Sequence, residues 1–229
     1  ATTEIYTLSL HDALPISEGI SMVLHNFIVF EGIDGAGTST QLKILQQRPD
    51  KDRFVFTAEP TDMPTGRFLR SMLQGEIKLD PRSTAYLFAA DRSEHLWGKT
   101  KEGNDRGIAA QCQQGKLVVS DRYFFSSLAY QSIDCGMELP LALNSIFPLP
   151  ELLFFFDITP SQSLARVDSR GEREIYENEP FLKQVCAAYR QVLERYADSG
   201  IKIVVLDARE SPEQLAAHIA GEIKSRYGI

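Results

Sequence analysis

Short apolar runs alternate with longer amphipathic stretches along the chain from Asn26 onward. The runs at residues 27–30, 54–56, 117–119, 152–156 and 203–206 are continuously apolar. Such runs are typical of parallel strands that are buried on both faces. The stretches between them show helical spacing, as at Leu182, Val185, Tyr189 and Leu193. The pattern therefore predicts a three-layer α/β fold with about five parallel strands and helices on both faces.

We expect residues 22–229 to form a single domain, because no repeat, low-complexity tract or linker interrupts the alternation. Residues 1–21 contain three acidic side chains but no Lys or Arg, which argues against a secretory signal. Residues 5–16 look like translated sequencing-adapter read-through, and Met22 directly precedes the first expected strand. We expect residues 1–21 to be a non-native or disordered extension.

Charge and cysteine content restrict the partners and the compartment. A formal net charge of −7 argues against a broad basic face for nucleic acid. An acidic chain can still bind phosphate through a few arginines and backbone N–H groups. Cys112, Cys135 and Cys186 form no C-x-x-C pair, and no apolar run reaches the roughly 20 residues of a membrane helix. We expect a cytoplasmic protein that binds neither nucleic acid nor membrane.

Polar residues directly follow four of the expected strands. They occupy residues 31–37, 57–60 and 120–123, and Asp157 ends the fourth run. Ligands of open parallel sheets bind beyond the carboxyl ends of the strands. We therefore expect these four polar clusters to converge on one edge of the sheet.

Residues 32–39, GIDGAGTS, have the spacing of the phosphate-binding loop G-x-x-x-x-G-K-[ST]. Its glycines let successive N–H groups point into one concavity that cradles phosphate oxygens. Ser39 would supply a hydroxyl ligand to Mg²⁺. Thr38 stands at the lysine position, so the loop alone predicts nucleotide binding and leaves turnover open. A tight glycine turn is the less favoured alternative, given the flanking strand and helix. The candidate phosphate-binding residues are Gly32, Ile33, Asp34, Gly35, Ala36, Gly37, Thr38, Ser39 and Thr40.

The sequence EGIDGAGTSTQ at residues 31–41 resembles the P-loop of thymidylate kinases, apart from Thr38. TAEP (57–60), PTGRFLR (64–70), LFAADRSEHL (87–96), SDRYFFSSLAYQ (120–131) and RVDSRGEREIYENEPF (166–181) follow in the order and spacing of that family. The resemblance covers nearly the whole chain from about Asn26. It implies a P-loop NTPase-type fold with a short lid, and Mg²⁺-dependent transfer of the γ-phosphate of ATP to dTMP for dTTP synthesis. ATP and dTMP are the expected partners, and a homodimer is the expected assembly.

Two i, i+4 pairs on expected helices suggest how an acceptor would be held. Phe88 and Arg92 share one helical face, where a ring and a guanidinium can stack on a base and donate to its carbonyl. A core position is the commoner fate of such a Phe. The resemblance implies that Arg92 meets O4 of thymine and that Gln131, one turn after Ser127, meets its N3. The residues that the resemblance assigns to dTMP are Glu59, Arg70, Phe88, Arg92, Arg122, Ser127 and Gln131.

The expected catalytic groups follow the strands and lie in the lid. Asp121 and Arg122 end a buried strand, where an Arg suits bidentate contact with phosphate and an Asp suits Mg²⁺. A basic loop hinged at Gly171 could close over ATP and place positive charge at the transition state, although a solvated charged turn fits its composition equally well. We expect a lid arginine to replace the missing lysine. The expected catalytic residues are Asp34, Asp121, Arg122, Arg166, Arg170 and Arg173, with Ser39 and Asp121 as Mg²⁺ ligands.

Two other functions stay open at this level. Related P-loop kinases share the Asp-Arg element, so the acceptor could be another nucleotide or nucleoside. A nucleotide-binding module with weak or lost turnover is suggested by Thr38 and by Ala58, where bacterial thymidylate kinases usually carry Arg. The retained acceptor residues favour an active dTMP kinase over both. Tyr123 and Tyr130 are expected to be packing residues.

Overall fold

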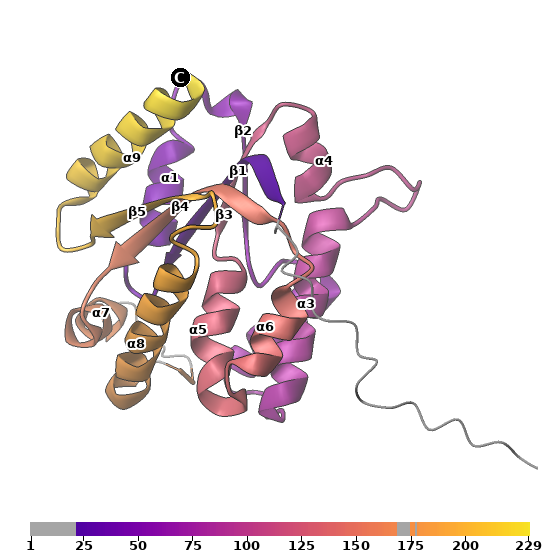
Figure 1. Ribbon diagram of the computed structural model, residues 1–229, viewed down its shortest axis with the longest axis vertical. Coiled ribbons are helices and arrows are strands. Elements are labelled where there is room, and N and C mark those ends of the chain that lie inside the picture. Colours follow the sequence, from indigo (N-terminus) through magenta and orange to yellow (C-terminus); the bar gives the residue numbers. More distant parts are fainter. Residues whose placement is uncertain (1–21, 169–174, 177) are drawn as a thin grey trace, which may run out of the picture.

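The computed structural model describes residues 22–168, 175–176 and 178–229. Its centre is a parallel five-stranded sheet with strand order β2-β3-β1-β4-β5 (Figure 1). The strands are β1 (Val23–Gly32), β2 (Phe54–Ala58), β3 (Leu117–Asp121), β4 (Leu149–Asp157) and β5 (Lys202–Asp207). Each of the five apolar runs lies in one of these strands, which confirms the predicted α/β class.

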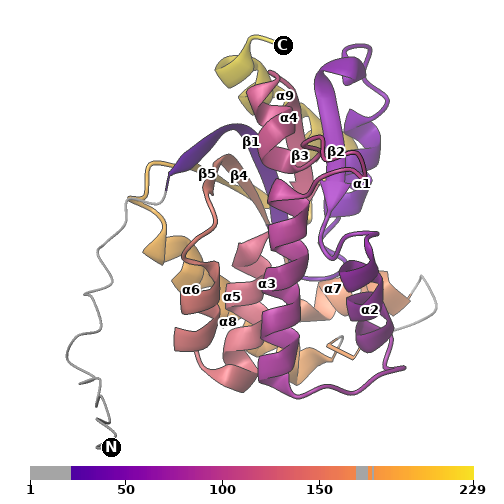
Figure 2. The same ribbon diagram turned by 90° about the vertical axis from the view of Figure 1, so that its right-hand side faces the viewer.

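Helices cover both faces of the sheet (Figures 1 and 2). The described helices are α1 (Thr38–Leu45), η1 (Lys51–Arg53), α2 (Pro64–Leu73), α3 (Pro81–Trp97), α4 (Ile108–Gln113), α5 (Phe124–Cys135), α6 (Glu138–Asn144), α7 (Pro160–Asp168), α8 (Glu179–Arg195) and α9 (Pro212–Tyr227). On one face α1 contacts β1 and β3, and α9 packs on α1. On the other face α5 contacts β1 and packs against α8, while α3 and α6 extend this layer beside α5.

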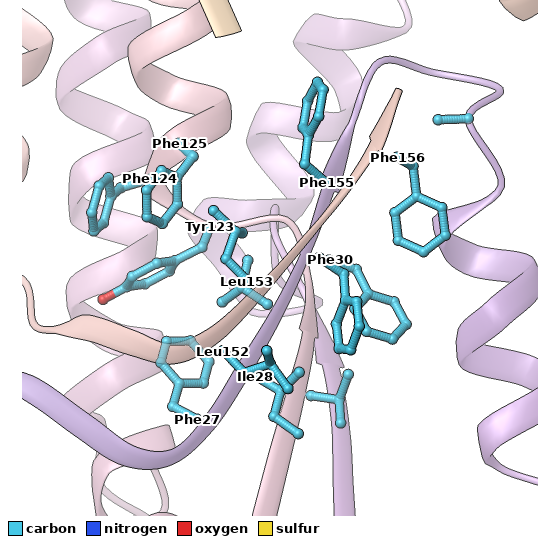
Figure 3. Close-up of a cluster of buried hydrophobic side chains, with 14 of the residues drawn as sticks. Phe27, Ile28, Phe30, Tyr123, Phe124, Phe125, Leu152, Leu153, Phe155 and Phe156 are labelled. Atoms are coloured by element: carbon cyan, nitrogen blue, oxygen red, sulfur yellow. The ribbon is translucent and has the colours of Figure 1, made fainter. Parts of the chain in front are cut away.

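Aromatic side chains of β1 and β4 fill both interfaces between sheet and helices. Phe30 packs against Phe154 and Phe156, with ring centroids 5.4 Å apart in both pairs. On the opposite face Phe27 lies 5.0 Å from Tyr123, and Phe155 lies 5.1 Å from Tyr189 of α8. Figure 3 shows Phe27 and Tyr123 on one side of these strands and Phe30 with Phe156 on the other. Burial on both faces explains why these strands read as continuous apolar runs.

The expectation that every run is buried on both faces is wrong at β5. This strand lies at the edge of the sheet, and Val205 in its middle is 59% exposed. An edge strand has a neighbour on one side only, and here helix packing leaves part of its surface uncovered. The sequence pattern gave no sign of this, because an apolar run looks the same at an edge as at the centre.

The expected polar clusters do converge at the carboxyl ends of the strands. Asp121 pairs in register with Phe30 of β1 and with Ala58 of β2, so the segments that follow these strands start side by side. The loop after β1 turns sharply at Gly35, whose φ is +79°. A Cβ there would lie 2.6 Å from the Ser163 carbonyl oxygen of α7, so glycine is required on both counts. The sheet therefore presents the glycine loop, β2 and β3 on one edge.

The packing predicts that substitutions in the neighbouring strands β4 and β5 change the free energy of unfolding by very different amounts. We expect Phe154→Ala in β4 to lower the free energy of unfolding by roughly 3–5 kcal/mol, because Phe154 is fully buried against Phe30. We expect Val205→Ala in β5, the matched control, to change it by about 0.5 kcal/mol or less. Urea unfolding measures both values, and similar losses in the two variants would contradict the packing described here.

Candidate functional site

A cavity of about 300 Å³ opens at the carboxyl ends of β1, β2 and β3. Its walls come from the glycine loop, from the segment after β2, and from helices α2, α3 and α5. Its lining residues are Ile33, Asp34, Gly35, Gly37, Thr38, Ser39, Ala58, Glu59, Pro60, Arg70, Leu73, Phe88, Arg92, Asp121, Arg122, Tyr123, Ser126, Ser127, Tyr130, Gln131 and Tyr176. Every residue that we expected at the dTMP site is among them.

The glycine loop contributes six of the nine expected phosphate-binding residues to this cavity. Gly32 and Ala36 are instead packed in the interior, and the side chain of Thr40 is exposed on α1. The backbone N–H of Thr40 donates to the Gly37 carbonyl at 3.1 Å, so the first turn of α1 already uses it. Gly37 itself is the N-cap of α1 with φ 103°, and no side chain caps this helix. The loop thus lies at the uncapped positive end of a helix, where an anion is favoured.

Asp34 of the loop and Arg122, which follows β3, form an ion pair across the cavity. Arg122 Nη2 donates to Asp34 Oδ1 at 2.6 Å, and the Tyr130 hydroxyl donates to Asp34 Oδ2 at 3.2 Å. The Arg122 guanidinium also lies 5.4 Å from the centroid of the Tyr130 ring. The carboxylate in the phosphate loop therefore holds an arginine.

Arg122 adopts a left-handed backbone conformation with φ 73°. This conformation is uncommon outside glycine and marks positions that the surrounding structure holds in place. The Arg122 N–H donates to the Phe30 carbonyl at 2.8 Å, and its side chain is 21% exposed. Burial disfavours the charge of this guanidinium, but Asp34, Tyr130, Tyr189 and Glu31 together outweigh burial and raise the pKa of Arg122 well above its ordinary value. Arg122 is a permanent cation fixed at the edge of the cavity.

Arg92 is buried at 1% exposure and is held by a network of carboxylate, amide and hydroxyl groups. Its Nε and Nη2 donate to Glu59 Oε2 at 2.9 and 2.7 Å. Nη1 donates to Asn144 Oδ1 at 2.6 Å, and Nη2 also donates to Ser127 Oγ at 3.1 Å. An arginine has five N–H groups, so within the described parts of the chain one on Nη1 has no hydrogen-bond partner. Arg92 can offer a base a single donor, and it also fixes Glu59 and Ser127.

Three polar atoms of residues that line the cavity are buried without a hydrogen-bond partner in the described part of the chain. They are Gln131 Oε1 on α5, Arg70 Nε on α2 and Asp121 Oδ1 at the end of β3. Arg70 Nη2 donates to the Pro60 carbonyl, while its Nε lies 3.8 Å from the exposed carboxylate of Asp62 and makes no hydrogen bond. Leaving a buried polar atom unpaired costs about 1–3 kcal/mol, which a complementary ligand can recover. Phe88 lies beside them, half-buried in the wall and not in the core.

Ser39 and Asp121 lie together at the phosphate loop, as a magnesium site would require. The Ser39 hydroxyl donates to Asp121 Oδ2 at 2.6 Å, and Asp121 Oδ1 is buried without a partner among residues 22–168 and the other described positions. No group of three or more His, Cys, Asp or Glu side chains in this part of the structure could hold a metal by itself. Oxygen donors of this number suit a cation such as Mg²⁺ that keeps water and phosphate ligands.

Of the three expected lid arginines, Arg166 is described and belongs to helix α7. Its guanidinium donates to the carbonyls of Gly35 at 3.3 Å and of Ala208 at 2.7 Å. Arg166 therefore lies behind the phosphate loop and does not line the cavity. Arg170, Gly171 and Arg173 lie outside the described residues.

Comparison with known proteins adds to this geometry. A family model described as thymidylate kinase matches residues 30–219. The chain belongs to the thymidylate kinase family. A Treponema pallidum protein assigned by name to the thymidylate kinases is 39% identical over 207 residues, which cover 88% of this chain and 96% of that protein. The thymidylate kinase of Leptospira interrogans is 38% identical over 174 residues, which cover 73% of this chain and 81% of that protein.

Several residues of this thymidylate kinase site were not expected from the sequence. Tyr130, set aside as a packing residue, lines the cavity and bonds Asp34; its i, i+4 relation to Ser126 could have suggested a shared face. His95 Nδ1 donates to the Glu59 carboxylate at Oε1 over 3.1 Å, and the Thr57 hydroxyl is hydrogen-bonded to the other ring nitrogen. Asn144 comes from α6, 52 residues after Arg92, and no sequence signal connects the two.

Glu31 is a further charged residue that the sequence analysis did not single out. It lies in β1, one residue before the phosphate loop, and is completely buried. Burial raises the pKa of its carboxyl to about 7, although Arg122, Ser126, Tyr189 and the Tyr123 N–H favour the charged form. An acidic residue directly after the continuously apolar run at residues 27–30 was a visible signal for an unusual environment.

The raised pKa of Glu31 predicts a pH-dependent stability. Between pH values of about 4.5 and 7 the folded protein keeps a proton that the unfolded chain has released, so the free energy of unfolding falls as pH rises and levels off above 7. Glu31→Gln lacks this contribution, which amounts to roughly 3 kcal/mol at most. We expect the Tm of this variant, relative to the parent, to rise between pH 5 and 7.5.

Glu151→Gln is the matched control. Burial opposes the charge of Glu151, but hydrogen bonds from the Asn26 N–H and from Arg226 lower the pKa of this carboxyl. Its titration therefore lies below pH 4.5, and its Tm difference from the parent should stay constant over the same interval. A constant difference for Glu31→Gln as well would show that Glu31 titrates normally.

Proposed function

We propose that this chain transfers the γ-phosphate of ATP to dTMP in the cavity at the carboxyl edge of the sheet, with Mg²⁺. The observation that carries the proposal is the placement of two buried atoms without a hydrogen-bond partner among the described residues, Arg70 Nε and Gln131 Oε1, in a cavity that opens onto a phosphate-binding loop. One is cationic and suits a phosphate; the other accepts a hydrogen bond and suits the N3–H of a thymine. Membership of the thymidylate kinase family supports both assignments.

The base would be recognised at the end of the cavity formed by α3 and α5. Gln131 offers an acceptor, and the remaining Nη1–H of Arg92 offers a donor, which together match the N3–H and O4 of a 4-keto pyrimidine. Phe88 supplies an aromatic face beside them. Because Glu59, Asn144 and Ser127 hold Arg92 from three sides, its orientation is set before the base arrives.

Arg70 and Arg122 would hold the acceptor phosphate, with Asp34 keeping Arg122 in place. Phosphoryl transfer depends on positioning and on neutralising charge more than on covalent chemistry. Arg122 contacts the phosphate loop through Asp34 and lines the acceptor side of the cavity, so it lies where donor and acceptor phosphates would meet. The proposed catalytic role of Arg122 is to neutralise charge that both phosphates share.

Ser39 and Asp121 are the residues that would hold Mg²⁺, directly or through water. Their adjacent oxygens, one of them unpartnered, fit this hard cation. When bound, the ion would neutralise charge on the phosphate oxygens of ATP.

The alternatives are less well supported. A kinase for a cytosine or adenine nucleotide would not need the Gln131 and Arg92 pair, which suits a 4-keto pyrimidine. A module without turnover would not need to keep Asp34, Asp121 and Arg122 in mutual register. We also propose that the enzyme acts in the cytoplasm; among the described residues no helix is long and apolar enough to cross a membrane.

A homodimer also remains a proposal. Tyr86 and Trp97 are 55% and 44% exposed and lie about three turns apart on one face of α3. Ile146, 68% exposed, adjoins Phe147, whose ring lies 5.5 Å from that of Trp97. Exposed apolar groups that gather on one face are typical of an interaction surface. Sedimentation equilibrium of the purified protein tests this assembly.

The assignment predicts strong discrimination at the base. We expect kcat/KM for dTMP to exceed that for dCMP by about 10⁴-fold, because the Arg92 donor would face an amino group of cytosine. Gln131→Met should lower kcat/KM for dTMP by roughly 10- to 100-fold, since the N3–H would lose its acceptor. Gln113→Met, on the exposed surface of α4, should not change it. A coupled assay of ADP formation gives these values, and comparable kcat/KM for dTMP and dCMP would overturn the assignment.

Thr38 raises the question of which cation replaces the loop lysine. We propose Arg166, because its guanidinium lies against the Gly35 carbonyl at the back of the loop. Arg166→Ala should lower kcat roughly 10²- to 10³-fold with the affinity for dTMP little changed, and adding Thr38→Lys should partly restore kcat. Lys43→Ala is the control, because this exposed lysine of α1 does not line the cavity. Near-parental kcat in Arg166→Ala rules the compensation out, and absence of Mg²⁺-dependent turnover in the parent favours the inactive module.

A further inference from the structure

Glu31 is acidic, completely buried and absent from the cavity lining, so it does not contact a substrate bound there. Its carboxylate nevertheless accepts four hydrogen bonds. The backbone N–H groups of Tyr123 and Ser126 donate to Oε1 at 2.8 and 3.2 Å. The hydroxyls of Ser126 and Tyr189 donate to Oε2 at 2.5 and 2.9 Å. A residue that only filled space beneath the loop would not need a carboxylate with four donors.

Three of these four bonds come from the first turn of α5. Tyr123 is the N-cap of that helix and Ser126 is its third residue, and no side chain of the helix caps it. The first N–H groups of a helix lack partners within it and attract negative charge. Glu31, supplied from β1, takes the place of the missing cap. It therefore fixes the start of α5, and with it the residue immediately before, Arg122.

Ser126 connects the buried carboxylate to Arg122 directly. The Ser126 hydroxyl donates to Glu31 Oε2 and accepts from Arg122 Nη1 at 3.0 Å. Since a hydroxyl has a single hydrogen, its donation to Glu31 leaves its lone pairs turned toward the guanidinium. Arg122 in turn reaches Asp34 through Nη2. A continuous chain of bonds thus runs from β1 through α5 to the phosphate loop.

The left-handed backbone of Arg122 needs such support. A non-glycine residue in this conformation costs of order 1–3 kcal/mol and persists where neighbouring contacts over-determine it. Here the Phe30 carbonyl holds the N–H of Arg122, and Glu31 holds the N–H of the next residue. Phe30 and Glu31 are consecutive in β1, so this strand accepts hydrogen bonds from the backbone N–H groups on both sides of the Arg122 α-carbon.

We propose that Glu31 is a positioning residue for phosphate recognition: acting through Ser126 and the start of α5, it holds the Arg122 guanidinium where the acceptor monophosphate binds. This inference rests on the proposed function, because it takes Arg122 as a ligand of the dTMP phosphate. It assigns Glu31 no contact with substrate. Its effect should therefore be confined to ligands that carry the phosphate.

Binding of dTMP and of thymidine, measured by calorimetry, separates positioning from a general structural role. In Glu31→Gln the dissociation constant of dTMP should rise about 10-fold, the effect of one weakened charged hydrogen bond, while that of thymidine stays within twofold. Glu151→Gln is the control: Glu151 also accepts a backbone N–H, an arginine and a tyrosine, but at the amino end of β4. It should leave the ratio of the two constants at the parental value.

Ser126→Ala tests the connection. Because Ser126 also lines the cavity, the informative measurement is the double variant with Glu31→Gln. If Glu31 acts through Ser126, the dissociation constant of dTMP in the double variant should not exceed the larger of the two values in the single variants. If the two residues act independently, the fold-increases of the single variants should multiply. Glu31→Asp, which keeps the charge but shortens its reach, replaces Glu31→Gln in every comparison if the latter does not fold.

The outcomes are distinct. Equal weakening of dTMP and thymidine, or no weakening of either, overturns the positioning role. Multiplying effects in the double variant overturn the route through Ser126. A parent that binds thymidine as tightly as dTMP shows instead that the cavity does not recognise the phosphate, and the proposed function itself fails.

Discussion

Burial of charge at the carboxyl edge of the sheet is the constraint on which the site depends. Arg92 is almost completely enclosed, and an isolated buried guanidinium would be too costly to keep. Its stabilisation needs Glu59 from the segment after β2, Ser127 from α5 and Asn144 from α6. Three separate parts of the chain must therefore meet at one side chain. Because Arg92 needs these hydrogen-bond partners whether or not a ligand is bound, they determine the shape of the proposed base-binding end of the cavity.

The proposed phosphate end depends on a second set of ionisable groups, of which Glu31 is completely buried while Asp34 and Arg122 are partly exposed. Hydrogen bonds link Asp34, Arg122 and Glu31, directly or through Ser126. Removing one partner of such a set leaves the others uncompensated, so each position constrains the next. Because Glu31 belongs to β1, the central strand of the sheet supports Arg122 through Ser126. Glu31 thus connects the central strand of the fold to an arginine of the proposed site.

The sequence predicted what depends on local pattern and missed what depends on distant contacts. The five strands and the glycine loop were visible because strand burial and loop geometry leave a signature within a few residues. The edge exposure of Val205 and the pairing of Arg92 with Asn144 were not visible, because both depend on how separated segments pack. Tyr130 does pack in the core, as expected, but its bond to Asp34 was not visible, because a tyrosine that only packs and one that also lines a cavity have the same apolar neighbours in sequence. Arg166 was assigned to the lid because a helix end and a loop are hard to distinguish by composition.

The net charge around the cavity explains why the absence of a loop lysine matters. Among the described residues, the charged side chains in its wall are the carboxylates Asp34, Glu59 and Asp121 and the guanidiniums Arg70, Arg92 and Arg122. The two sets cancel, so these groups offer no net positive charge to two substrates that both carry phosphate. The uncapped start of α1 supplies partial positive charge, but only about half an elementary charge. A lysine at position 38 would make the net charge of these groups positive. With Thr38 there, the added positive charge has to come from a bound cation or from another arginine, such as the one behind the loop. Charge neutralisation, more than recognition of the base, is therefore where this chain departs from the P-loop pattern.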